Sequence, residues 1–410
     1  MSTNNLYRGL FELLTLPHGD AAAQMLLTTG RAARRELLVI ARQEGCLPEL
    51  YARWAVQSLL SPTESSEHEQ FMQRRASVDE VMRALPPGTL VAGADAATAV
   101  EVLLPDFAAI GPLHEAIGRL GYRLGESGQW RVPPRGPMHH GLAAFNYVPA
   151  TFSAVTIAVR VGGVPIDPRR QFGFADLAGE AVRLDGLPCR VLAPTRQLLH
   201  RIAGFGARAT PVTLREIAEL HLLLKDAARR IDTAWLQVKL EQLDAWVGLQ
   251  RLREAIVAKR LGSQLGWGEF GRMVDASASH GQAAASTRGR APRVATFLRD
   301  AFALVQGQRR DDIPAKLARA PWLVSQVLAA GYSVRGVLVS SKPSDAPRFM
   351  RIDGALYLAT GAGLFLLSLV DLDDAARAAL GERARTGSRP VVLARWSAAR
   401  SVGRSGARAR

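Results

Sequence analysis

The sequence predicts an α+β protein in which a mixed sheet packs with a helical bundle and a small β-rich module follows. Three observations predict this class. Apolar residues recur at helical spacing through about the first eighty positions, and again from about 193 to 261. Short β-branched runs, broken by Gly and Pro, lie between these two helical regions. Further short apolar runs with hairpin turns lie near the end of the chain.

The first helical region spans residues 1–85. Leu6 and Leu10 begin an apolar stripe with the spacing of one helix face. Ser61 before Pro62 marks the end of one helix and the start of the next, because Pro cannot continue a helix and Ser can cap one. We therefore expect several short helices and one longer one before the first strand.

An α/β core is predicted over residues 86–192. Thr89–Ala92 and Ala99–Leu104 are apolar runs of strand length, and Pro112–Leu120 has the pattern of a helix. Ser153–Val161 alternates and is β-branched, which predicts a later strand. The order of these segments favours a strand, loop, strand, helix, strand unit.

The rest of the chain, from residue 193 onwards, falls into four segments. The pattern of residues 193–272 predicts a helical bundle. The next segment, 273–292, is rich in Ser, Ala and Gly and has no periodicity, which predicts a linker. Residues 293–396 predict a helical and β-rich module, and the Arg-rich residues 397–410 a basic disordered tail.

The overall composition and charge indicate which kinds of protein and partner are plausible. The chain has 410 residues, of which 48% are hydrophobic, so it can bury a sizeable core. A net charge of +15 favours anionic partners, although a dispersed Arg-rich surface with no ligand is the plainer interpretation. Cys46 and Cys189 lie far apart without metal-ligand spacing, which argues against a zinc site and predicts buried thiols.

No segment has the pattern expected for membrane insertion or secretion. The N-terminus lacks a basic segment followed by an apolar core and a cleavage site. The most apolar window, 355–370, is short for a membrane span and contains Gly361 and Gly363. We therefore expect a cytoplasmic protein without membrane insertion.

Five segments together carry a resemblance. In chain order they are ELLVIARQEGCLPELYARW, AIGRLGYRL, VTIAVRVGGVPID, VLAPTRQLLHRIAG and LREIAELHLLLKDAARRIDTAWL. Their order resembles a bacterial family of uncharacterised nucleotidyltransferase-fold proteins, some of which belong to biosynthetic clusters for modified peptides. The resemblance covers about residues 5–260 and implies a nucleotidyltransferase-like core.

The resemblance also implies where chemistry would take place. The family uses a Gly-rich turn after the first strand, paired carboxylates on the second strand and a third carboxylate on a later strand. Alternate residues of a strand share one face, where acids can hold two Mg²⁺ ions against a triphosphate. In this chain Gly93 matches the turn, and Glu101 matches one acid of the pair. Ala99 stands where the other acid is expected, and the strand VTIAVR carries no acid.

The candidate catalytic residues are Glu101, which matches the family, and the nearby acids Asp95 and Asp106, which do not alternate with it along the strand; Glu101 and Asp95 are the candidates for holding the metal. Gly93, Arg169 and Arg170 are the candidates for contacting the nucleotide phosphates.

Each acid also has a structural interpretation. Asp95 would cap a short helical stretch, and Glu101 would lie on an exposed strand face or pair with an arginine. Asp106 would stabilise the turn after Pro105.

The histidines are weaker candidates. His139 and His140 lie in a Gly/Pro-rich segment without a third ligand at helical or strand spacing. His200 and His221 lie on predicted helices beside Leu runs, which is typical of packed core histidines.

These observations lead to three hypotheses. The first is a nucleotidyltransferase-like protein, catalytically degenerate, that serves as a nucleotide- or peptide-binding accessory in a bacterial biosynthetic pathway. The second is an active nucleotidyltransferase that uses Mg²⁺ and a nucleoside triphosphate with non-standard carboxylates. The third is a basic nucleic-acid-binding protein, against which the aromatic content of 6% argues.

Overall fold

The structure is a computed structural model, and the residues that it describes fall into several ranges. They are 3–16, 31–94, 99–125, 127–131, 142–151, 154–165, 171–207, 210–243, 245–262, 265–287, 324–325, 327–328, 333–353, 355–369, 375, 377–380, 382 and 391–395. The predicted basic tail, 397–410, lies outside them.

The helices are, in chain order, α1 Thr3–Thr15, α3 Arg31–Gln43, α4 Leu47–Val56, α5 Pro62–Ala84, α6 Ile110–Gly118, α7 Phe174–Ala178, α8 Pro194–Ala207, α9 Leu214–Asp226, α10 Thr233–Leu243, α11 Trp246–Ala258 and α12 Gly268–Thr287. Short 3-10 helices are η1 Phe107–Ala109 and η3 Ala228–Arg230.

The strands are β1 Leu90–Ala94, β2 Ala99–Leu104, β3 Tyr122–Leu124, β4 Ser127–Arg131, β5 Leu142–Pro149, β6 Thr156–Val161, β7 Gly163–Pro165, β8 Gln171–Gly173, β9 Val182–Arg183, β10 Arg190–Val191, β11 Val334–Ser340, β12 Arg348–Ile352, β13 Ala355–Thr360, β14 Gly363–Ser368 and β15 Val391–Arg395.

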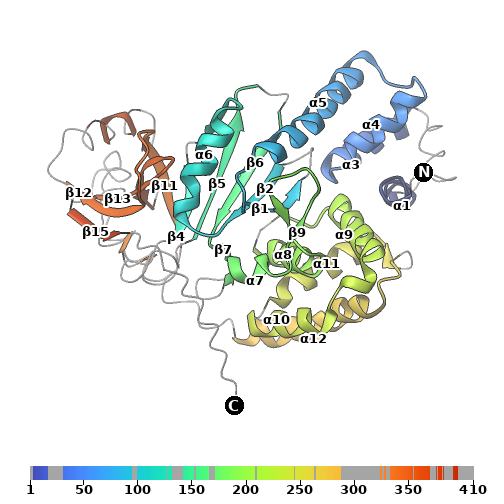
Figure 1. Ribbon diagram of the computed structural model, residues 1–410. Helices are drawn as coiled ribbons and strands as arrows, with labels where there is room; N and C mark the ends of the chain where they lie inside the picture. The colour runs from blue at the N-terminus through green and yellow to red at the C-terminus, as the bar shows by residue number, and fades with distance from the viewer. Residues whose placement is uncertain are drawn as a thin grey trace, which may run out of the picture.

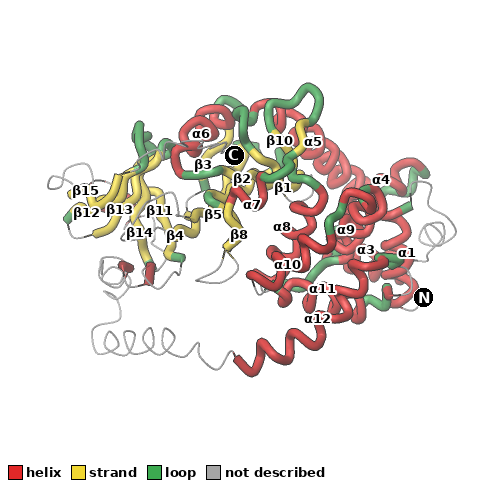
Figure 2. The backbone as a smooth tube through the Cα atoms, turned by 60° about the horizontal axis from the view of Figure 1, so that its bottom comes forward, coloured by secondary structure: helices red, strands yellow, loops and turns green. Residues whose placement is uncertain are grey.

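The predicted mixed α/β architecture is confirmed. Thirteen strands form one mixed sheet in the order β15-β12-β13-β14-β11-β4-β5-β6-β2-β1-β10-β9, with β3 paired to β5. The strand β2 runs antiparallel to β1 and parallel to β6. As Figures 1 and 2 show, most helices gather at one end of this sheet, and the C-terminal strands lie at the other.

One face of the central strands is apolar. Successive residues of β6 alternate between buried and partly exposed, as expected for a strand with one covered face. The buried residues Val100, Val102 and Val159 belong to one core with Ile110 and Leu113 of α6. The helices α5 and α6 cover this face in Figure 1, so the polar residues of β2, β5 and β6 lie on the opposite face.

The N-terminal helices do not form a region of their own. Residues of α1, α3 and α4 share one hydrophobic core with α8 to α12, and Leu90 and Leu103 of the sheet join it. An amphipathic helix of ten to thirteen residues is marginal alone and needs a partner for its apolar stripe. The two helical regions predicted on either side of the sheet therefore form one bundle.

A buried carboxylate ties the two halves of this bundle together. Glu44, which follows α3, accepts hydrogen bonds from Lys259 Nζ at 2.6 Å and from the Leu214 backbone N–H at 2.6 Å. The second bond satisfies a free N–H at the start of α9, where the helix dipole also favours a negative charge. The Glu44 and Lys259 side chains are only 10% and 9% exposed.

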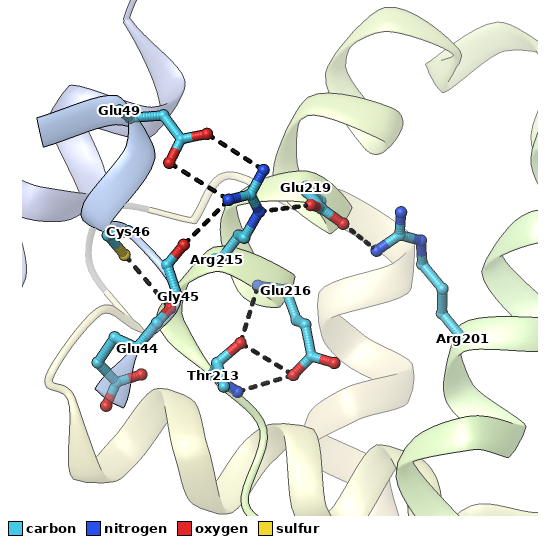
Figure 3. Close-up of polar contacts among 9 residues, drawn as sticks. All are labelled: Glu44, Gly45, Cys46, Glu49, Arg201, Thr213, Arg215, Glu216 and Glu219. Atoms are coloured by element: carbon cyan, nitrogen blue, oxygen red, sulfur yellow. Dashed lines mark hydrogen bonds and ion pairs between the residues drawn. The ribbon is translucent and has the colours of Figure 1, made fainter. Parts of the chain in front are cut away.

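A chain of ion pairs continues from this joint. Arg215 donates to the Gly45 carbonyl and pairs with Glu49 and Glu219, and Glu219 pairs in turn with Arg201 of α8 (Figure 3). Burial, followed by the charges of Glu49 and Glu44, raises the pKa of the neighbouring Cys46 thiol well above its usual range. Cys46 is therefore a neutral packed thiol, and both cysteines are buried, as predicted.

The predicted linker 273–292 is helical as far as the structure describes it. The helix α12 continues to Thr287 and buries Phe270, Met273, Val274 and Ser277, which have the spacing of one helix face. The Ser and Gly residues dilute this stripe in the sequence, while Ala has the highest helix propensity of any residue.

The C-terminal strands continue the sheet of the core and do not form a separate module. The strand β11 pairs antiparallel with β4, and Gly336 lies opposite Gly128 at this junction. The Trp130 side chain, which is fully buried, packs over the junction and stacks on Phe145, with ring centroids 5.5 Å apart. A Cβ atom at position 336 would overlap the Trp130 ring.

Gly336→Ala tests this junction. Because the new methyl group overlaps a ring that is packed on all sides, we expect a loss of at least about 2 kcal/mol of unfolding free energy. Thermal or urea denaturation measures it. Gly93→Ala is the matched control, because it lies on strand β1 and a Cβ there meets nothing within 4 Å. Equal effects of the two substitutions would contradict the junction described here.

Glu44→Gln tests the helical joint. The change leaves the Lys259 ammonium buried without its charge partner, so we expect a loss of about 3–5 kcal/mol in urea denaturation. Glu12→Gln is the control: it breaks an ion pair with Arg8, whose side chain is 66% exposed, and should lower the free energy of unfolding far less. A small effect at Glu44 would mean that solvent reaches Lys259.

Candidate functional site

The residues that could carry chemistry lie on the polar face of β2 and β6. Glu101 points from β2 to this face, opposite the covered residues Val100 and Val102. The parallel register places Arg160 of β6 beside Leu103, two positions from Glu101 along the strand. Arg160 donates from Nε to Glu101 Oε1 at 2.5 Å. Their side chains are 32% and 25% exposed, so the pair is partly shielded from water.

A histidine from the bundle completes the cluster. His200 lies on α8, which packs its apolar residues Leu198, Leu199 and Ile202 into the bundle core. Its Nε2 is 3.4 Å from Glu101 Oε1 but makes no hydrogen bond, and the residue is only 5% exposed. His200 is thus a packed histidine, as predicted, but one ring nitrogen is unsatisfied and faces the carboxylate.

The charge state of Glu101 follows from these contacts. Burial raises the pKa of Glu101, but the nearby His200 and Arg160, together with the hydrogen bond from Arg160, outweigh burial, and the net pKa lies well below its usual range. A carboxylate that stays ionised beside a guanidinium is neutralised from within the protein. A metal ion at Glu101 would have to compete with Arg160 for the same oxygen.

The structure gives Asp106 a different role. The carboxylate follows β2 and accepts from the backbone N–H groups of Ala108 at 2.8 Å and Ala109 at 3.2 Å. It therefore caps the turn η1, which is the structural interpretation made from the sequence. Glu101 pairs with an arginine, again as that interpretation expects.

Gly93 lies within a strand. It belongs to β1, faces Glu101 across the antiparallel pair and follows a register shift after Val91. Its φ is not in the left-handed region, and a Cβ would meet nothing within 4 Å. The predicted turn is thus replaced by an irregular strand, and space remains open beside Glu101.

Several predicted residues lie outside the described part of the chain. These are Asp95, Arg169, Arg170, His139 and His140. Among the described residues, no three His, Cys, Asp or Glu side chains come together in an arrangement that could hold a metal ion. In the same ranges, no helix has the length and apolarity needed to cross a bilayer.

The polar face continues into an open pocket of about 340 Å³ between β4, β5, β6 and β11. Its lining includes Arg160, Asn146, Gln129 and Arg335. Larger hollows, of about 610 and 490 Å³, lie between α4 and α5 and meet at Phe71. Their walls are largely apolar, and two of their arginines, Arg42 and Arg215, are paired with acids.

Sequence reasoning missed Arg160, His200 and Arg335 as site residues. The signal for Arg160 was present, because it alternates with Thr156 and Ala158 in VTIAVR and therefore shares their face. Nothing local indicates that His200 of α8 reaches this face, since that depends on how the bundle packs.

Comparison of the chain with protein-family models, with curated proteins and with solved structures finds no match.

Glu101→Gln tests the electrostatics of the cluster. Because the folded pKa is lowered, the ionised carboxylate stabilises the protein fully above pH 4.5, its ordinary value, and less as the pH falls below that. We expect the variant to lose about 1–2 kcal/mol at pH 7 and less at pH 4, measured by urea denaturation. Glu115→Gln on α6, whose pair with Arg119 is exposed, is the control. A deficit that grows in acid would contradict the pairing.

Proposed function

We propose that the chain is a nucleotidyltransferase-like protein without metal-dependent catalysis, which serves as a nucleotide- or peptide-binding accessory in a bacterial biosynthetic pathway. The resemblance of residues 5–260 supports the assignment to this class. The arrangement of β1, β2, α6 and β6 is compatible with it, because β2 lies between an antiparallel and a parallel neighbour and carries Glu101 on the polar face.

One observation is the main support for a protein without metal-dependent catalysis. The carboxylate that matches the family's metal-binding acid accepts a hydrogen bond from Arg160 at 2.5 Å. Two Mg²⁺ ions need several oxygen ligands held in near-octahedral geometry. Ala99, two residues before Glu101 on β2, and Ala158, its register partner on β6, share the face with Glu101, and neither has a carboxylate. The bond from Arg160 to Glu101 thus supports a protein without metal-dependent catalysis.

The active-enzyme alternative would use Glu101 with Asp95 or Asp106. Asp106 is already engaged with two backbone N–H groups. An active enzyme would therefore need Asp95 as a ligand and would need Arg160 to move away from Glu101. The experiment below distinguishes an active enzyme from a protein without metal-dependent catalysis.

The experiment is calorimetric titration of the full chain with ATP and GTP, once with Mg²⁺ and once with excess EDTA. We expect any nucleotide affinity to be the same, within about twofold, in both buffers and in Glu101→Gln, because Arg160 and not a metal faces the ligand. Glu115→Gln controls for the loss of one acid.

Binding that requires Mg²⁺ and disappears in Glu101→Gln but not in Glu115→Gln would overturn the proposal in favour of an active enzyme. If no nucleotide binds in either buffer, nucleotide binding is excluded and a peptide is the ligand that the proposal retains.

A further inference from the structure

The strand β9 ends the sheet beyond β10. In the described part of the chain β9 pairs with β10 alone, Val182 with Val191 and Arg183 with Arg190. Arg190 donates its backbone N–H to the carbonyl of Thr89, directly before β1, at 2.9 Å, so its own N–H and C=O point away from β9. Arg183 and Arg190 are therefore a non-hydrogen-bonded pair, and the backbone N–H and C=O of Arg183 face the free edge of the sheet.

This register sets two like charges side by side. Residues that oppose each other in a non-hydrogen-bonded pair have Cα atoms only about 4.5 Å apart and side chains on the same face. Arg183 is exposed and Arg190 is half-buried, and among the described residues neither side chain has a hydrogen bond or an ion pair. Because directly opposed like charges destabilise a sheet, an anion that lies against both guanidinium groups would stabilise the pair.

The other face of the same edge is apolar. Val182 and Leu184 alternate with Arg183 along the chain, and each is 41% exposed. Leu184 lines the hollow of about 610 Å³ together with Leu187 and with Met72 of α5, which is 50% exposed. The edge thus presents apolar, basic and apolar side chains in succession, beside a hollow with room for a further apolar side chain.

Charge distinguishes the possible occupants of this edge. A second copy of the chain would bring its own Arg183 to the edge, and a charged residue on a short edge strand opposes such self-pairing. A lone phosphate would meet the two arginines but would leave the apolar face and the backbone groups of β9 without a partner. In an added strand, the residue opposite Arg183 has its side chain on the face of the arginines, and its neighbours have theirs on the apolar face.

We propose that the edge of β9 binds an extended peptide segment, in which acidic and apolar residues alternate, as an added strand. The acidic side chain opposite Arg183 accepts hydrogen bonds from Arg183 and Arg190, and the flanking apolar side chains cover Val182 and Leu184. This surface goes beyond the proposed function, since β9 is the third strand from β2 in the sheet and the binding needs neither a nucleotide nor a metal.

The test is fluorescence anisotropy of a labelled peptide, in which glutamate and valine alternate, titrated with the full chain at constant ionic strength. We expect Arg183→Gln to weaken peptide binding about tenfold or more, as loss of a charge-assisted hydrogen bond does, and Arg190→Gln to weaken it similarly. Arg123→Gln, which changes an exposed arginine on the short strand β3, is the matched control and should leave binding unchanged.

A second peptide separates strand addition from simple charge attraction. It has the same composition, with the glutamates and valines in two separate blocks, and we expect it to bind more weakly, because only alternation places the carboxylates on one face. Thermal denaturation checks the fold of Arg183→Gln, which removes an exposed side chain and relieves a repulsion, so its melting temperature should not fall.

Three binding results would overturn the proposal: no binding of the alternating peptide, unchanged binding in Arg183→Gln, or equally tight binding of the block peptide. Displacement of the peptide by an equal concentration of inorganic phosphate would also overturn it, in favour of a simple anion site. A lower melting temperature of Arg183→Gln would do the same, because this arginine would then stabilise the fold itself. Since these variants leave Glu101 intact, the result is separate from the nucleotide and metal dependence tested above.

Discussion

One constraint organises the molecule, namely that the central strands must be apolar on the face that α5 and α6 cover. With a side-chain period of two, every polar residue of β2, β5 and β6 is then directed to the other face. Glu101, Arg160 and Asn146 share that face for this reason, although they lie far apart in the sequence. The polar surface is thus a consequence of how the core is built.

The same face is partly shielded by the helical bundle, and this shielding sets its electrostatics. The bundle is held by Glu44, which joins the α3–α4 turn to α9 and α11. Since α8 packs within that bundle, His200 is fixed 3.4 Å from Glu101. The Glu101 carboxylate therefore lies between a buried imidazole and a guanidinium, and the surrounding protein lowers its pKa.

The sequence predicts local elements well and long-range pairings poorly. The unit from β1 to β3 was predictable, because Gly and Pro separate runs of clear periodicity. The pairing of Glu101 with Arg160, 59 residues later, was not, because parallel register depends on packing and not on neighbouring residues. The helix α12 was missed because Ser and Gly dilute its buried stripe. The union of β11 with β4 was missed because glycines weaken a strand pattern, although Gly128 and Gly336 are what allow Trp130 to cover the junction.

That union changes how the C-terminal strands should be understood. If β11 to β15 formed a sheet of their own, they would be separate from the strands of the core. Joined through β4, they place Arg335 on the pocket that Arg160 also lines, and they extend the polar face beyond residues 5–260. The C-terminal strands therefore share one polar face with the core strands β4, β5 and β6.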